Sequence, residues 1–357
     1  MKQKKAVVMV LKLGLAVGLL AYLVYQAQGH QRLDSLRKQP KDWSLLLGAG
    51  GCFLVAVLLT FVRWYALIRT LGLPVRLGDA MRLGFLGYAF NFVSLGNVGG
   101  DFLKAVFIAQ RHPGQRTEAV ATVVVDRLVG LYALFLLASG AILMAGFDRQ
   151  ATSTPLTMIC RTTLWSTALC TVALVVLLAV RVGAGPAGQR LSRLPWVGRL
   201  PWIESTLARL LSAAAIYRRN LWVLVAATIG SLCVHSLFAV GIYLIARGLP
   251  GAAPTLIEHF LITPVSMVVG AVPITPSGLG TFEAALEYMY RFVGNGDSGP
   301  VASGSVVSGV IVGLGYRLIT VLIAMVGVCF YFARRREVDR ALHDEEFVEV
   351  AQQARNS

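Results

Sequence analysis

Six apolar segments, each about as long as a bilayer is thick, constrain this chain more than any other feature. They cover residues 6–25, 43–64, 119–145, 158–180, 221–246 and 301–333. A helix needs roughly 20 apolar residues to cross the hydrocarbon core. Only 14% of the residues are charged, whereas soluble domains carry roughly 25%. We therefore expect an all-α integral membrane protein with about six full spans.

Two further apolar regions are interrupted by polar and glycine-rich backbone. The first covers residues 80–110 and is broken at Gly96–Asp101, and the second covers residues 256–293 and is broken at Pro273–Gly280. Each apolar piece holds about 12–17 residues, which is short for a full crossing. We predict two broken, re-entrant helical hairpins; the alternative is that both regions cross fully.

The formal net charge of +15 is concentrated in the connecting segments. If both broken regions re-enter, residues 1–5, 65–118, 181–220 and 334–357 share one side and hold 21 of the 33 Lys and Arg residues. This bias matches the positive-inside tendency, so the charge indicates orientation rather than nucleic-acid binding. We predict a multi-pass protein of the cell (inner or plasma) membrane with cytoplasmic termini. The loop at 30–42 does not fit, because its basic residues fall outside.

The order of spans and breaks is repeated along the chain. Two spans, a broken region and one span make up residues 1–145, and the same series makes up residues 158–333. Three crossings per half would turn the second half over, which predicts an inverted repeat within a single membrane domain at 1–335. Transporters built this way form their sites where broken helices meet. We predict an amphipathic interfacial helix within the loop at 181–220. We also predict a polar cytoplasmic tail at 336–357.

Each break places free backbone amides beside an acidic residue. Unsatisfied backbone groups are costly in hydrocarbon, so a broken helix must be buried in protein or face a polar cavity. Asp101 is placed to cap the helix that follows the first break, and Glu283 lies one turn beyond the second. A helix start favours phosphate or carboxylate groups. The alternative is that the glycines only allow close helix packing.

Two arginines lie within predicted spans, Arg127 in the third and Arg317 in the last. An arginine at the centre of a membrane helix costs about 2.5–3.5 kcal/mol on insertion scales, so each needs a partner. The partner is either a carboxylate or the phosphate of a lipid headgroup, and a carboxylate could hold the arginine until phosphate displaces it. Asp126 and Arg127 point about 100° apart and need separate partners. Arg63, near a predicted span end, is expected to snorkel toward the surface.

These arguments define a candidate substrate site with neither a metal nor a cofactor, because no histidine or cysteine has ligand spacing. Its residues are Asn97, Gly99, Gly100, Asp101, Lys104, Asp126, Arg127, Pro276, Gly278, Gly280, Glu283 and Arg317.

Three stretches together resemble a known family: GNVGGDFLKAVFIAQR, EAVATVVVDRLVGLYAL and PITPSGLGTFEAALEYM. The pattern is similar to the flippase-like membrane domain of lysylphosphatidylglycerol synthetases, over about residues 5–335. Lys104 stands where arginine is common in that family, and Ser277 stands where glycine is common. Because the chain ends soon after its last predicted span, we expect a stand-alone member without the synthetase domain.

The resemblance implies a lipid flippase or transporter that moves an anionic, aminoacylated or isoprenoid-linked lipid between leaflets. Its partners would be the bilayer and a lipid with a phosphate-containing headgroup. Two alternatives are a membrane-embedded glycosyltransferase-like enzyme and a non-transporting scaffold of a lipid-synthesis pathway. No acidic pair for a nucleotide sugar is evident, so we expect a transporter rather than an enzyme. Substrate identity, direction, energy source and oligomeric state do not follow from the sequence.

Overall fold

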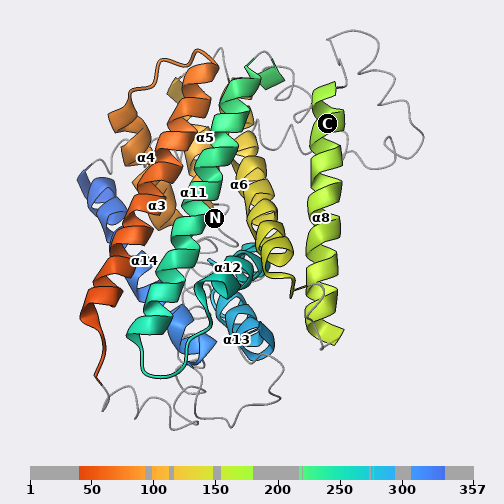
Figure 1. Cartoon of the computed structure of the whole chain (residues 1–357). Helices are drawn as coiled ribbons and strands as arrows, with labels where there is room; N and C mark the ends of the chain where they lie inside the picture. The colour runs from red at the N-terminus through yellow and green to blue at the C-terminus, as the bar shows by residue number, and fades with distance from the viewer. Residues whose placement is uncertain are drawn as a thin grey trace.

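The computed structural model describes most of the chain between residues 40 and 333. The described residues are 40–92, 99–111, 116–147, 154–179, 217–218, 220–272, 275, 277–293 and 307–333. Within them the secondary structure is helical, in nine helices (Figure 1). These are α3 (Trp43–Thr70), α4 (Leu77–Asn91), α5 (Gly99–Arg111), α6 (Arg116–Ala145), α8 (Thr154–Ala179), α11 (Leu221–Gly248), α12 (Leu256–Ala271), α13 (Thr281–Val293) and α14 (Gly309–Ala333).

Five of these helices are long and apolar enough to cross a membrane: α3, α6, α8, α11 and α14. They correspond to five of the six spans predicted from the sequence, which are thereby confirmed as long apolar helices. The predicted span at 6–25 lies outside the described residues, as do the tail at 336–357 and most of the loop at 181–220. Helix α3 runs six residues further than predicted, to Thr70.

Both predicted interruptions are present as breaks between short helices. The first broken region forms α4 and α5, and the second forms α12 and α13. The start of α12 is fixed by a capping box, in which the Thr255 side chain accepts from the Glu258 amide and the Glu258 carboxylate accepts from the Thr255 amide. Such a reciprocal cap satisfies two of the amides that a helix start leaves unpaired.

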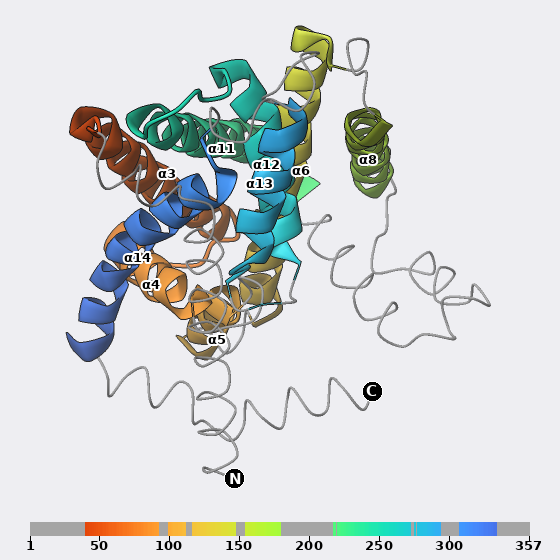
Figure 2. The ribbon, with the colours of Figure 1, turned by 90° about the horizontal axis from the view of Figure 1, so that it is seen from below.

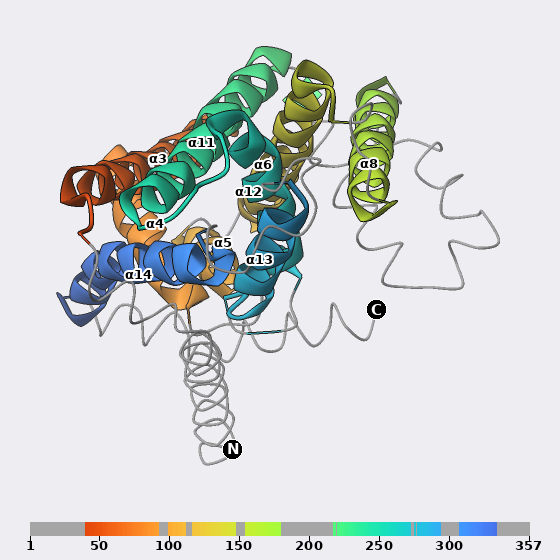
Figure 3. The same cartoon turned by 60° about the horizontal axis from the view of Figure 1, so that its bottom comes forward.

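Helices α3 and α11 pack side by side along one side of the bundle and run antiparallel (Figures 2 and 3). The amide of Asp42, just before α3, donates to the carbonyl of Gly248 at the end of α11, 3.1 Å away. Phe53 of α3 packs tightly over Gly241 of α11, where any side chain would collide with the ring. Phe53 also contacts Phe238 of α11 and Tyr316 of α14, so the core lies where these three helices meet.

The two short-helix pairs lie toward opposite ends of the α3–α11 pair. Helices α4 and α5 lie toward the end where α3 finishes, and α12 and α13 toward the end where α11 finishes (Figure 1). Each pair also packs against a long helix from the other half of the sequence: α4 lies along α14, and α12 lies along α6 (Figures 2 and 3). Helix α8 stands at the edge of the bundle, against α6 (Figure 2).

Candidate functional site

At the second break the chain turns through backbone conformations that only glycine adopts easily. Gly278 and Gly280 have φ values of 66° and 85°, and Ser277 has a φ of 54°. Left-handed backbone is favourable for glycine and uncommon for other residues, which accounts for glycine-rich sequence here and makes Ser277 a strained position. Gly278 also lies against the carbonyl of Gly270 in α12, too close for a side chain to fit. The chain thereby returns directly from α12 into α13.

Arg317 of α14 reaches into this turn and is fully engaged there. Its Nε and Nη2 donate to Oε1 of Glu283 at 3.1 and 2.9 Å, and its Nη1 donates to the carbonyl oxygen of Ser277 at 3.1 Å. The other carboxylate oxygen of Glu283 accepts from the amide of Gly280 at 2.7 Å. The Arg317 side chain is 8% exposed and that of Glu283 is 0% exposed. This is a neutral, buried pair that also binds the backbone of the break.

The first break is held by a side chain and a close glycine crossing. Oδ1 of Asn91, the last residue of α4, accepts from the amide of Gly100 at 2.8 Å. Gly100 lies directly against the carbonyl of Gly87, with no room for a side chain between α4 and α5. Gly99 begins α5. Asn97 in this break and Pro276 in the second were also predicted as site residues, and both lie outside the described residues.

Asp101, the third residue of α5, is the centre of the charged groups at the first break. Its carboxylate accepts from Nε of Arg127 in α6, and from Nζ of Lys104 at 3.2 Å. The ammonium group of Lys104 also lies 5.0 Å from the ring centre of Trp64, a cation–π geometry. Asp101 and Lys104 are buried, whereas the Arg127 side chain is 44% exposed.

Asp126 and Arg127 have separate partners, as their adjacent positions on α6 predict. Asp126 accepts from Nε of Arg63 in α3 at 2.9 Å, and Nη1 of Arg63 donates to Ser231 of α11. The expectation that Arg63 snorkels to the surface is therefore wrong. Its guanidinium is buried in an ion pair, and α3 continues past it for two more turns. This pair joins three helices.

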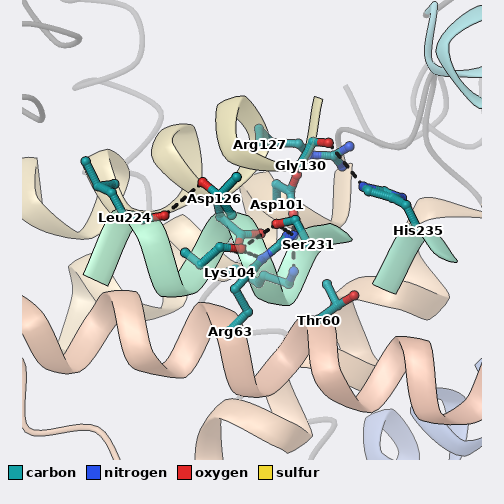
Figure 4. Close-up of polar contacts among 12 residues, drawn as sticks. Thr60, Arg63, Asp101, Lys104, Asp126, Arg127, Gly130, Leu224, Ser231 and His235 are labelled. Carbon is teal, nitrogen blue, oxygen red and sulfur yellow. Dashed lines mark hydrogen bonds and ion pairs between the residues drawn. The ribbon is translucent and has the colours of Figure 1, made fainter. Parts of the chain in front are cut away.

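Figure 4 shows both ion-paired groups in one region, which we call the first-break cluster: Arg63, Lys104, Arg127, Asp101 and Asp126. Three basic side chains here face two carboxylates, so the cluster carries one excess positive charge. His235 of α11 lies beside it, with Nε2 3.1 Å from the carbonyl oxygen of Gly130. Sequence reasoning did not select Arg63 or His235 as site residues, because their partners are more than 60 residues away.

The two breaks share one arrangement. The helix after each break has an acidic third residue, Asp101 in α5 and Glu283 in α13. Each carboxylate pairs with an arginine of the next long helix, Arg127 in α6 and Arg317 in α14. Each site thus places an ion-paired guanidinium near the start of a short helix. Among the described residues no group of three or more His, Cys, Asp or Glu residues is arranged to hold a metal ion.

Comparison with known families gives one match, to the model described as the lysylphosphatidylglycerol synthase TM region, over residues 9–327. The chain belongs to this family. No curated protein and no solved structure matches it. Membership confirms the resemblance predicted from the three motifs, all of which fall inside the matched residues. It also supports a membrane function related to lipids for this member of the lysylphosphatidylglycerol synthase membrane-region family.

Proposed function

We propose that this protein moves a lipid with a phosphate-containing headgroup between the leaflets of the cell membrane, as a flippase or lipid transporter. The observation that carries the proposal is the matched pair of sites, in which Asp101–Arg127 and Glu283–Arg317 stand at two helix breaks. Charged residues inside membrane segments commonly mark a substrate pathway. The phosphate that anionic, aminoacylated and isoprenoid-linked lipids share is the group that fits this chemistry, and the family supports a role with lipids.

An inverted repeat would give the two sites opposite orientations. The antiparallel contact of α3 with α11 supports it, since these helices hold equivalent places in the two halves. The reciprocal packing of α4 on α14 and α12 on α6 supports it as well. The positions of the two hairpins at opposite ends favour re-entrant hairpins over full crossings (Figure 1). One site would then serve the cytoplasmic leaflet and the other the outer leaflet.

The chemistry of transfer follows from competition between carboxylate and phosphate for the same arginine. Guanidinium binds either group through paired hydrogen bonds. A headgroup phosphate that reaches Arg127 replaces the carboxylate of Asp101, which keeps Lys104 as a partner. The excess positive charge of the first-break cluster favours a monoanionic headgroup. At the second break Arg317 would release Glu283, whose other oxygen keeps the Gly280 amide. Acyl chains remain in lipid throughout.

The test is leaflet exchange of fluorescent phosphatidylglycerol in vesicles that contain the purified protein. We expect R127A and R317A each to slow exchange at least about tenfold, the factor that corresponds to losing 1.4 kcal/mol of binding to the moving headgroup. R161A is the matched control, because Arg161 is an exposed arginine of α8 that belongs to neither ion pair. R317K separates loss of the bidentate contact from loss of the charge.

Exchange at the wild-type rate in both R127A and R317A would reject this function. The function would also be rejected if the wild-type protein does not accelerate exchange above the rate in empty vesicles for anionic, aminoacylated or isoprenoid-linked lipids. Size-exclusion elution and the thermal unfolding midpoint of each variant show whether a loss of exchange follows from a loss of folding.

A further inference from the structure

Helix α8 packs into the main apolar core through Leu156 and Cys160 near its start, and further along it meets α6 through a short row of hydroxyl contacts. Tyr132 Oη lies 3.1 Å from Oγ1 of Thr171, and Ser139 Oγ lies 2.6 Å from Oγ1 of Thr167. Thr167 also donates to the carbonyl oxygen of Phe135. In a membrane such interhelical hydrogen bonds average only about 0.6 kcal/mol each. The second half of α8 therefore meets α6 through this seam of weak hydrogen bonds.

This seam ends in the middle of α6. Leu128 lies one turn before Tyr132 on the same face of α6, and Val175 lies one turn after Thr171 on the seam side of α8. Both would be covered if the seam continued, yet Leu128 is 43% exposed and Val175 is 59% exposed. The two helices stand further apart toward this end (Figures 1 and 2). We call this stretch, lined by Leu128, Leu131 and Val175, the α6–α8 opening.

Arg127 lies at the border of this opening, next to Leu128 in the chain. Its side chain is 44% exposed, whereas those of the other four residues of the first-break cluster are 10% exposed or less. A partly exposed arginine that adjoins the exposed Leu128 in α6 matches the two parts of a phospholipid. The charge accepts a phosphate, and the apolar walls accept a hydrocarbon chain.

We propose that the α6–α8 opening is a lateral portal through which one monoanionic phospholipid enters from the bilayer. Its phosphate binds Arg127 while one acyl chain lies along Leu128 and Val175. The proposal rests on the proposed function and names the route to the first-break cluster. The occupant follows from charge, because a monoanionic headgroup neutralises the excess positive charge of the cluster, whereas a zwitterionic headgroup brings its own cation.

Photolabelling tests occupancy without requiring transport. Wild-type protein and R127Q are placed in vesicles with phosphatidylglycerol or phosphatidylcholine that carries a diazirine on one acyl chain, and labelled positions are mapped by mass spectrometry. We expect phosphatidylglycerol to label 128, 131 and 175 at least about tenfold more than phosphatidylcholine, the factor for 1.4 kcal/mol. R127Q should remove that preference. Leu169, on the far side of α8 and well exposed, is the internal control for lipid that merely surrounds the protein.

Filling the opening tests the route. L128W and V175W should slow leaflet exchange of phosphatidylglycerol by about tenfold or more, while L169W should leave it unchanged, since only the first two reduce the space for a chain. Equal labelling by both lipids at 128, 131 and 175 overturns the portal, and so does unchanged exchange in both L128W and V175W. Selective labelling without exchange in the wild type would instead support the portal and reject the proposed function.

Discussion

At the residue scale, the notable feature is how differently the two arginines are engaged. Arg317 is enclosed by Glu283 and by the backbone of Ser277 and Gly278, whereas Arg127 keeps nearly half of its side-chain surface exposed. The same pairing of carboxylate and guanidinium is therefore buried at the second break and partly exposed at the first. In the proposed cycle these are two states of equivalent sites.

The buried Glu283–Arg317 pair predicts that a single substitution lowers the stability of the protein more than a double substitution does. Removing one partner of a buried ion pair leaves an uncompensated charge and costs about 3–5 kcal/mol, whereas replacing both partners is often much less damaging. We expect R317M to be less stable than R317M/E283Q. Thermal unfolding in detergent, followed by intrinsic fluorescence, measures the difference. A double variant as unstable as R317M would show that Arg317 acts mainly through the carbonyls of Ser277 and Gly278.

At the element scale, each hairpin depends on a close backbone crossing. Gly100 meets Gly87, and Gly278 meets Gly270, with backbone in contact in both cases. We expect G100A and G278A to lower stability by about 1–3 kcal/mol or more, because the added methyl group separates the two arms. Gly278 also has a positive φ, so its variant should be the more severe. The readout is the detergent-unfolding midpoint.

Gly140 provides the matched control for these substitutions. It lies within α6 and has nothing within 4 Å of the position that a Cβ would take. G140A should be neutral or stabilising by up to about 1 kcal/mol, since alanine favours a helix. If G100A and G278A behave like G140A, the hairpins do not need their close crossings.

At the scale of the whole molecule, the inverted arrangement predicts which loops face which side. Arg76, before α4, should be cytoplasmic, and Ala252, before α12, should face outward; both residues are exposed. In a variant without the native cysteines, an impermeant thiol reagent applied to intact cells should label A252C and should label R76C only after lysis. Labelling of both before lysis, or of R76C alone, would contradict the proposed topology and the assignment of one site to each leaflet.

Much of the fold was predictable because apolar length is a local property. Five spans and both interruptions lie where the sequence placed them, since hydrocarbon thickness sets helix length and polar glycine-rich backbone interrupts it. The same locality predicted that Glu283 would stand one turn after the second break. The expectation that Asp101 caps its helix is wrong, because α5 begins earlier, at Gly99, and the Asp101 carboxylate pairs with Arg127 and Lys104 instead. Arg63 was misjudged, because a charge near an apparent span end is locally indistinguishable from a snorkelling one.

The sequence by itself determined that this is a helical membrane chain of the lysylphosphatidylglycerol synthase membrane-region family, with two interrupted segments and acids and arginines placed near them. Only the tertiary structure decided which charges meet: Arg63 with Asp126, Arg127 with Asp101, and Arg317 with Glu283. The physical reason is that ion pairs between helices depend on packing over tens of residues. The same packing leaves the Arg127 side chain partly exposed and encloses Arg317.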